Sequence, residues 1–379
     1  MELVSSNPVA NGSLRESKSA PRVVDLRSDT VTRPTDTMRA AMAKADVDDD
    51  VLGSDPTADQ LQRQVAKLMG KEAGLFVPSG TMGNLISVLV HCEVRGSEVI
   101  LGSDSHIHVY ENGGISTIGH VHPRVVPNKE DGTMDLRKIE ASIRPKELLY
   151  ATTRLICIEN THADCGGRCI TAEYTDKLGE LAKSYGLKVH VDGARIFNAS
   201  TALGVPVDRL VSAADSVSVC LSKGLGAPVG SVIVGSQEFI AKAKKLRKTL
   251  GGGMRQVGVL CAAGLVALHD MVGRLKDDHH KCRILAEGLN GIDGLHVNLD
   301  AVHTNIVFVN ITADSIPGAE ELCEAMKHEG VLAIPMSHTR FRFVTHHQIS
   351  EDDIRYTLAC FKNHFQGTLL RSPTVSEIA

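Results

Sequence analysis

Several features that mark particular protein classes are missing from this 379-residue sequence. No uninterrupted apolar run approaches the ~20 residues that a helix needs to cross a bilayer, which argues against a membrane span. The formal net charge is only -4, so no strong overall field would attract nucleic acid or anionic lipid. Tryptophan is absent and aromatic residues make up 3% of the chain. We therefore expect small-molecule chemistry, with no nucleic acid and no membrane as partners.

The pattern of cysteines and the lack of targeting signals argue against further classes of protein. The nine cysteines are an odd number and lie mostly inside apolar runs, so no disulfide framework is expected. Cys165 and Cys169 have no second Cys/His pair at zinc-finger spacing, and no metal site is expected. The N-terminal residues lack both a secretory apolar stretch and an Arg-rich transit pattern. We expect disordered or flexible tails at 1–22 and 366–379 and a cytoplasmic protein.

The remaining composition is that of a folded α/β protein. Hydrophobic residues make up 42% and charged residues 23%, which are ordinary globular proportions. From Val23 onward, apolar strand-like runs alternate with helical stretches, as in an α/β fold. Because the chain exceeds the usual size of one domain, we expect a large domain over 23–270 and a small C-terminal α+β domain over 271–365.

Turn and cap residues set the expected elements. Asp55 and Pro56 supply the N-cap and first-turn proline of a helix that ends at Gly70. A long helical pattern over 256–290 links the two domains. Apolar runs predict buried strands of the large domain at 75–78, 99–101, 155–158, 187–191, 216–221 and 229–234. The small domain is expected to have strands at 295–299, 305–311, 331–334 and 341–344, with helices at 319–328 and 351–364.

A lysine in an unusual position gives the strongest chemical signal. An apolar strand delivers Ser222 and Lys223 into a turn that contains Gly224, Gly226 and Gly230. A solvated turn lysine needs neither the glycines nor the buried strand. A Schiff-base lysine does, because it requires close approach of a cofactor and partial burial to lower its pKa from ~10.4. Lys223 alone leaves both interpretations open.

A second residue, Asp192, helps to choose between the two interpretations of Lys223. It ends a buried strand about thirty residues upstream, where α/β sheets bind ligands. An ionised carboxylate against a pyridine nitrogen would keep the ring of pyridoxal 5'-phosphate (PLP) protonated, and so able to accept electrons. Taken alone, Asp192 could equally cap the following helix. Its pairing with Lys223 favours the cofactor interpretation.

A glycine-rich turn offers a place for the cofactor phosphate. Ser79, Gly80 and Thr81 lie between a strand and a helix, where unpaired backbone N–H groups and the helix dipole favour anions. This motif alone is weak evidence for a phosphate site. The evidence is much stronger when the phosphate loop, Asp192 and Lys223 follow one another in this order along the chain. Neither GxGxxG nor GxxxxGK[ST] occurs at a strand-to-helix turn, which disfavours nucleotide-binding alternatives.

These residues lie within segments that resemble a known family. The segments are DLRSDTVTRP (25–34), PSGTMGN (78–84), SHIHVYENGG (105–114), ENTH (159–162), HVDGARIFN (190–198), CLSKGLGAPVGS (220–231) and GGGMRQ (251–256). In this order they resemble the L-threonine aldolases, the plant members most. The resemblance covers about residues 23–365. It implies the PLP-dependent transferase-like fold (fold type I), a large domain with a mostly parallel seven-stranded sheet and a small C-terminal domain.

The resemblance also implies roles for individual residues. Lys223, beside Ser222, matches the Schiff-base lysine, Asp192 the partner of the pyridine nitrogen, and Ser79, Gly80 and Thr81 the phosphate loop. His106 matches a histidine that stacks on the cofactor ring, although by itself it would be taken for a core or surface histidine. Ser28, Arg195 and Arg342 match residues that hold the substrate carboxylate, and Arg195 also matches a residue of the cofactor site. His162 matches a histidine near the substrate hydroxyl. Arg255 matches an arginine that reaches the cofactor phosphate of a neighbouring subunit.

The implied function is PLP-dependent cleavage of L-threonine, L-allo-threonine and related β-hydroxy amino acids to glycine and an aldehyde, in threonine catabolism and glycine biosynthesis. The reach of Arg255 implies a homo-oligomer, a dimer of dimers with active sites at the subunit interface. The alternatives are a β-eliminating lyase or aminotransferase of the same fold, or a non-catalytic scaffold subunit. In one departure from the family pattern, ENTH is followed by Ala163, Asp164 and Cys165 where the family often has Asn, which places negative charge near His162.

Overall fold

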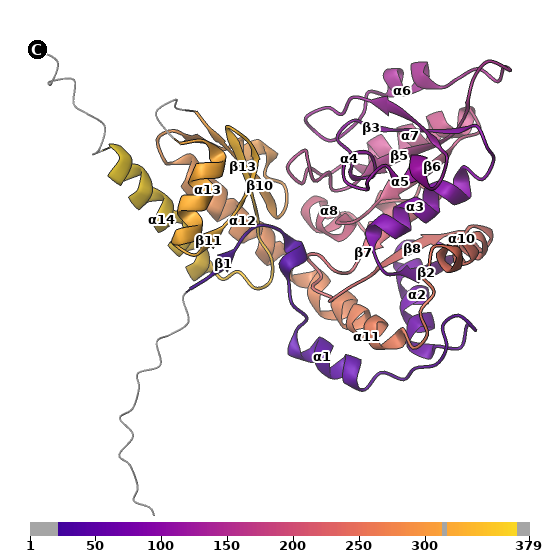
Figure 1. The fold of residues 1–379 in the computed structure, drawn as a ribbon, viewed down its shortest axis with the longest axis horizontal. Coiled ribbons are helices and arrows are strands. Elements are labelled where there is room, and N and C mark those ends of the chain that lie inside the picture. Colours follow the sequence, from indigo (N-terminus) through magenta and orange to yellow (C-terminus); the bar gives the residue numbers. More distant parts are fainter. Residues whose placement is uncertain (1–21, 313–316, 370–379) are drawn as a thin grey trace, which may run out of the picture.

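The computed structural model describes residues 22–312 and 317–369. In Figure 1 the chain forms a large body and a smaller body that is drawn in orange to yellow and carries the C-terminal elements. Most of the two expected tails therefore lies outside the described residues. The exception is the end of α14 (Glu351–Leu369), which continues past the expected helix end at residue 364.

A seven-stranded sheet forms the centre of the large body, in the order β2-β8-β7-β6-β5-β3-β4. Its strands are β2 (Ala73–Val77), β3 (Ser97–Gly102), β4 (His122–Val126), β5 (Thr152–Glu159), β6 (Lys188–Asp192), β7 (Ser216–Cys220) and β8 (Ser231–Gly235). Strands β3 to β7 pair in parallel, whereas β8 is antiparallel to β7 and β2. The expected mostly parallel seven-stranded sheet is confirmed. The sequence missed only β4, an edge strand with few buried residues.

Helices pack around the sheet of the large body (Figure 1). They are α1 (Asp36–Ala43), α2 (Pro56–Leu68), α3 (Gly80–His91), α4 (His106–Val109), α5 (Gly114–Thr117), α6 (Leu136–Ser142), α7 (Ala172–Ser184), α8 (Ile196–Leu203), α9 (Val207–Leu210), α10 (Gln237–Thr249) and α11 (Gly258–Val266), with the 3-10 turn η1 (Asp29–Val31). The predicted caps of α2 are confirmed. Asp55 Oδ1 accepts a hydrogen bond from Ala58 N at 2.9 Å, and Gly70 follows the helix with φ +62°.

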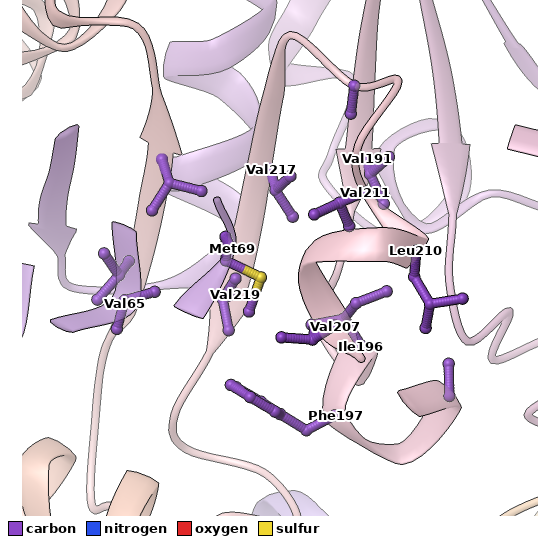
Figure 2. Close-up of a cluster of buried hydrophobic side chains, with 14 of the residues drawn as sticks. Val65, Met69, Val191, Ile196, Phe197, Val207, Leu210, Val211, Val217 and Val219 are labelled. Carbon is purple, nitrogen blue, oxygen red and sulfur yellow. The ribbon is translucent and has the colours of Figure 1, made fainter. Parts of the chain in front are cut away.

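The central strands bury both faces of the sheet. Figure 2 shows Val191 of β6 and Val217 of β7 in a cluster of buried apolar side chains with residues of α2, α8 and α9. Successive side chains of a strand point to opposite faces, so His190 and Asp192 point to the other face of β6. There α3 covers them, and Asn84 of that helix contacts both. The face of the sheet beneath α3 thus combines these polar residues with apolar ones such as Val77 and Ile233.

The small body is an antiparallel sheet in the order β12-β13-β10-β9 with helices against it. Its elements are β9 (Leu295–His296), η4 (Leu299–Ala301), β10 (Ile306–Ile311), β12 (Ile334–Ser337), β13 (Arg340–Val344), α12 (Leu275–Asn290), α13 (Ala319–His328) and α14. The expected strand at 331–334 is divided. Its first part, β11 (Val331–Leu332), pairs in parallel with β1 (Val24–Asp25) instead.

Two features bear on the expected domain boundary at 270/271, which stays a prediction. Val24 and Leu26 pack in the hydrophobic core of the small body, although they belong to the expected large domain. The helical run Gly258–Asn290 crosses the boundary through a π-helical segment, η2 (Ala267–Met271), and η3 (Val272–Arg274). By length and composition this run is apolar enough to span a membrane, but 50% of its most apolar window is buried. α11 contacts α1 and α2, as a core helix does.

Candidate active site

The predicted chemical residues gather at the carboxyl ends of the parallel strands, where α/β sheets place their ligands. Asp192 is the last residue of β6, and Lys223 follows the end of β7. Ser79 joins β2 to α3 as the N-cap of that helix, and His106 begins α4 after β3. These residues come from four different strand ends, so the parallel sheet itself assembles the site.

Asp192 is fixed by hydrogen bonds on both carboxylate oxygens. The side chain of Asn84 donates to Oδ2 at 2.8 Å, and the backbone N–H of Ala194 donates to Oδ1 at 3.1 Å. The residue is 3% exposed. A buried carboxylate needs such donors to remain ionised. The sequence did not single out Asn84.

The Lys223 turn depends on its glycines. Gly226 and Gly230 have φ of +75° and +106°, a region that side chains with a Cβ rarely adopt. The backbone oxygen of Lys223 accepts hydrogen bonds from Gly226 N at 2.8 Å and from Thr32 Oγ1 at 3.2 Å. Lys223 itself is half-buried, between the sheet and solvent. The predicted lysine turn is therefore held in place by hydrogen bonds of its backbone.

The start of α3 has the shape of an anion site. Ser79 Oγ accepts a hydrogen bond from Met82 N at 3.1 Å. The other N–H groups of the first turn have no acceptors within the helix, because every helix start lacks them. Ser79 and Thr81 are exposed. A Cβ added to Gly80 would lie 2.8 Å from Cys220 Sγ, so only glycine lets this turn pack so close to β7. The geometry fits a phosphate group.

His106 belongs to a small charged cluster. Its Nδ1 lies 2.9 Å from Glu111 Oε1, and its backbone N–H donates to Glu159 Oε2 at 2.7 Å. One ligand atom each of His106, Glu111 and Asp192 lies within 4.8 Å of the others. The hydrogen bond with Glu111 raises the pKa of His106, whereas burial raises the pKa of Glu111. The ring lies beside Asp192 with its orientation fixed by Glu111.

Two arginines from different bodies meet near Lys223. Arg195 donates two hydrogen bonds to Asp29, from Nε at 2.8 Å and from Nη2 at 2.6 Å. Arg342 of β13 places Nη2 3.5 Å from Arg27 O, and its Nε is buried without a hydrogen-bond partner within the described chain. Burial, and after it the charge of Arg195, lowers the pKa of Arg342. The positive charge of the two neighbouring guanidinium groups attracts anions, although that of Arg195 is already paired with Asp29.

Four other predicted residues have mixed placements. Ser28 caps η1, with Oγ accepting from Thr30 N at 3.2 Å, so its hydroxyl is partly engaged locally. His162 is 1% exposed, and neither ring nitrogen has a partner within residues 22–312 and 317–369. Ser222 is half-buried beside Lys223. Arg255 is not brought to this group: its exposed guanidinium pairs with Asp49 at 2.7 Å.

The residues that the sequence reasoning missed all lie inside or beside its quoted motifs. They are Asp29, Asn84, Tyr110 and Glu111. Each contacts a residue that the sequence singled out, as Asn84 does with Asp192 and Tyr110 with Asp164. Motif position indicates that such residues matter. Only the fold shows which partner each one meets.

Comparison with known proteins places the chain among PLP-type folds and their sequence relatives. The family model described as beta-eliminating lyase matches residues 25–312. A probable low-specificity L-threonine aldolase 2 of Arabidopsis thaliana is 67% identical over 348 residues, covering 91% of this chain and 98% of that protein. The low specificity L-threonine aldolase of Escherichia coli K12 is 41% identical, covering 92% of this chain and 100% of its own.

Solved structures agree on the fold. A threonine aldolase from Leishmania major superposes with a TM-score of 0.75 at 18% identity, covering 90% of this chain and 99% of its own. A serine palmitoyltransferase from Sphingomonas wittichii gives a TM-score of 0.72 at 18% identity, covering 92% and 88%. At such identities the likeness concerns the fold alone. It confirms the predicted fold-type-I architecture.

Proposed function

This chain belongs to the beta-eliminating lyase family and, within it, to the low-specificity L-threonine aldolases, and from that membership we propose that it is a PLP-dependent aldehyde-lyase. It cleaves L-threonine and L-allo-threonine to glycine and acetaldehyde. One observation carries the proposal. The half-buried Lys223, the doubly anchored Asp192 and the helix start at Ser79 converge at one end of the parallel sheet.

The residues present fit PLP at each of its recognised groups. The cofactor, when bound, supplies an aldehyde that links covalently to amines and a ring that withdraws electrons from the bond to be broken. Lys223 would hold the aldehyde and Asp192 the ring nitrogen. Ser79, Gly80 and Thr81 would bind the phosphate. Glu111 Oε2 is buried without a hydrogen-bond partner among the described residues, as expected of an atom that contacts a bound group or a water molecule.

The amino-acid carboxylate would lie between the two bodies. Arg342 has an unpaired buried Nε and Arg195 contributes positive charge close to it. Ser28 lies on the adjoining segment. A carboxylate fixed at two points sets the rotation about the amine–Cα bond, and this rotation selects the Cα–Cβ bond for cleavage.

The substrate hydroxyl requires a base, and two histidines are suited to that role. His162 has two buried ring nitrogens without partners in the described chain, so its ring is free to bind a hydroxyl or a water molecule. His106 has one nitrogen held by Glu111, which leaves the other to face the cofactor. Either one can take the hydroxyl proton as a general base.

Product identity tests the proposal against its closest alternatives. Purified protein should be yellow, release glycine and acetaldehyde from L-threonine or L-allo-threonine, and lose this activity in Lys223→Ala. Lys245→Ala, a change on the exposed face of α10, is the control. A β-eliminating lyase would release ammonia and a keto acid from its substrate, and an aminotransferase would consume a keto acid. Either outcome, or a colourless inactive protein, would refute the aldolase assignment.

Exposed groups near the site also bear on the assembly of the enzyme. Exposed apolar residues near the site, Val109 at 46%, Tyr110 at 52% and Ile118 at 52%, together with the outward-facing Arg255, favour a homotetramer that shares its sites between subunits. We propose a cytoplasmic location and roles in threonine catabolism and glycine biosynthesis. Sedimentation of wild type and Arg255→Ala, combined with cofactor binding, tests whether Arg255 reaches a neighbouring site.

A further inference from the structure

A continuous row of polar side chains leads away from Asp192 beneath α3. Asn84 Oδ1 lies 3.1 Å from His190 Nε2, His190 Nδ1 lies 2.8 Å from Ser216 Oγ, and Ser216 Oγ lies 2.8 Å from His91 Nε2. Together with the bond from Asn84 to Asp192, each neighbouring pair is within hydrogen-bond distance. The catalytic mechanism outlined above uses none of the outer three residues.

The fold places these residues in line for clear reasons. Asn84 and His91 are seven residues apart on α3, two helical turns, and so lie on one face about 10 Å apart along its axis. His190 and Asp192 share the face of β6 that α3 covers, and His190 is the direct neighbour of Ser216 on β7. A Cβ on Gly83 would lie 2.7 Å from Ser218 Oγ, so glycine there allows the close approach of helix and sheet.

Hydrogen-bonding roles fix the direction of every proton in the row. The Asn84 amide nitrogen faces two carboxylates, Glu111 and Asp192, each at 2.8 Å, so both of its hydrogens are donated to them. Its oxygen therefore accepts from His190, which must carry its proton on Nε2 and accept on Nδ1. Ser216 donates to that nitrogen and accepts from His91. Every proton points toward the carboxylates.

Burial keeps the row neutral. His190, Ser216 and Asn84 are 0%, 0% and 1% exposed. Burial, joined by the neighbouring His91, lowers the pKa of His190 to about 3, and burial lowers the pKa of His91 to about 4. Neutral imidazoles can donate on one side and accept on the other, which the row requires. A neutral row delivers oriented dipoles to Asp192 without adding a competing buried charge.

The outer end of the row reaches the surface away from the catalytic residues. His91 is half-buried, stacks on Phe239 with ring centroids 4.9 Å apart, and lines a cleft of about 770 Å³ with Lys188 and Asp215. Ser216 is the first residue of β7, whereas Lys223 follows its last. The row therefore runs the length of the strands, from their amino ends to the cofactor site.

We propose that Asn84, His190, Ser216 and His91 form a directional relay of neutral groups that positions Asp192 opposite the cofactor's ring nitrogen. The relay rests on the proposed function, because it acts through the ring partner of PLP. Its members are positioning residues and touch no substrate. Removing the donor at His190 would let Asn84 rotate, and Asp192 would lose the oriented amide that holds its carboxylate in place.

Substitutions at His190 separate this role from simple packing. A glutamine amide can reach the place of Nε2 and donate to Asn84, whereas leucine cannot donate. We expect His190→Leu to lower kcat about tenfold with little change in KM, to weaken PLP binding, and to alter the pH dependence of the visible band of the bound cofactor. His190→Gln should restore all three readouts. Ser87→Ala is the control, because the Ser87 hydroxyl, 0% exposed, bonds within α3 to Gly83 O.

If folded His190→Leu matches Ser87→Ala in kcat, PLP affinity and visible band, the relay has no positioning role and the proposal is overturned. The same holds if His190→Gln and His190→Leu are equally impaired. A measurement that needs no variant is the ¹⁵N resonance pattern of histidine-labelled apoprotein. The relay requires His190 to be neutral with its proton on Nε2; a proton on Nδ1 would overturn it. Loss of aldol cleavage by wild type would instead refute the proposed function, whatever the state of His190.

Discussion

Asp29 and Arg195 form a buried ion pair in which the carboxylate accepts hydrogen bonds at 2.8 Å and 2.6 Å from the same guanidinium. Asn305, the residue just before β10 in the small body, donates a further hydrogen bond to Asp29 at 3.1 Å. The N-terminal segment, the large body and the small body therefore meet at one carboxylate. Arg195 is held in orientation before any substrate binds, which suits a residue that fixes a carboxylate.

The pair should make stability depend on acid pH. Burial alone would raise the pKa of Asp29, but Arg195 lowers it to about 2, from 3.8 for an unperturbed group. Stabilisation by a lowered pKa is complete above the unfolded value and is lost as pH falls through the folded one. We expect Asp29→Asn to cost about 3 kcal/mol at neutral pH, because Arg195 stays buried without its partner. The difference from wild type should shrink between pH 4 and pH 2.

Urea unfolding of both proteins over this pH range measures the effect. Asp59→Asn is the control. Asp59 pairs with Arg63 on the surface, where the side chains are 51% and 70% exposed, respectively. Such exposed pairs contribute about 0.5 kcal/mol to the free energy of unfolding. A constant difference between wild type and Asp29→Asn at all pH values would show that Asp29 does not titrate in this window.

Arg342 tests the two-point carboxylate clamp. Arg342→Lys keeps the charge but loses the planar fork that binds two oxygens. We expect kcat/KM for L-threonine to fall about tenfold or more, with increased exchange of the glycine α-proton relative to cleavage and little change in unfolding. Arg340→Lys, on the exposed part of the same strand, is the matched control. Unchanged KM and cleavage selectivity in Arg342→Lys would remove Arg342 from the clamp.

Asp164, the charged departure from the family pattern, has a partner that the sequence did not indicate. Tyr110 donates its hydroxyl proton to Asp164 Oδ2 at 2.7 Å, and burial together with Asp164 raises the pKa of Tyr110 to about 12. In Asp164→Asn the pKa of Tyr110 should fall but stay above 10, since burial remains. With 5 tyrosines and no tryptophan, ultraviolet titration can resolve one phenol by comparison with Tyr110→Phe. Identical titration of wild type and Asp164→Asn would contradict the pairing.

The sequence predicted most of the fold because its signals are local. Asp55, Pro56 and Gly70 mark the ends of α2, and continuous apolar runs mark the central strands. Edge strand β4 was missed because an exposed five-residue strand with proline has no such run. The division of the expected strand at 331–334 was not foreseen, since the partner of β11, β1, lies about 300 residues away in sequence and only the tertiary fold brings them together.

For the site, the motifs located the elements but not the contacts between them. Lys223 and Asp192 could be identified from strand ends and glycines. Asn84 could not, because its partners are 27, 106 and 108 residues away and an asparagine after a glycine turn is common at helix starts. Arg247 shows the same limit of sequence reasoning. It lies among the basic residues of α10 but is only 2% exposed, and helical periodicity does not reveal the buried carboxylate opposite it.

The buried carboxylate opposite Arg247 is that of Asp50, and the stability of the protein should depend on this ion pair. Arg247 Nη2 donates to Asp50 Oδ2 at 2.5 Å and Nη1 donates to Phe76 O at 2.8 Å. Arg247→Met keeps the volume but leaves Asp50 buried and unpaired, which should cost about 3–5 kcal/mol of unfolding free energy. Lys245→Ala, on the exposed face of the same helix, should change it by less than about 0.5 kcal/mol.

A double-mutant cycle separates the charge from the packing. Asp50→Ala combined with Arg247→Met removes both charges, so it should recover part of the stability that Arg247→Met alone loses. Chemical unfolding of the four proteins at pH 7 gives the coupling free energy. If the two single losses simply add in the double variant, the ion pair is not what makes Arg247 costly to replace, and packing against Phe76 accounts for its burial.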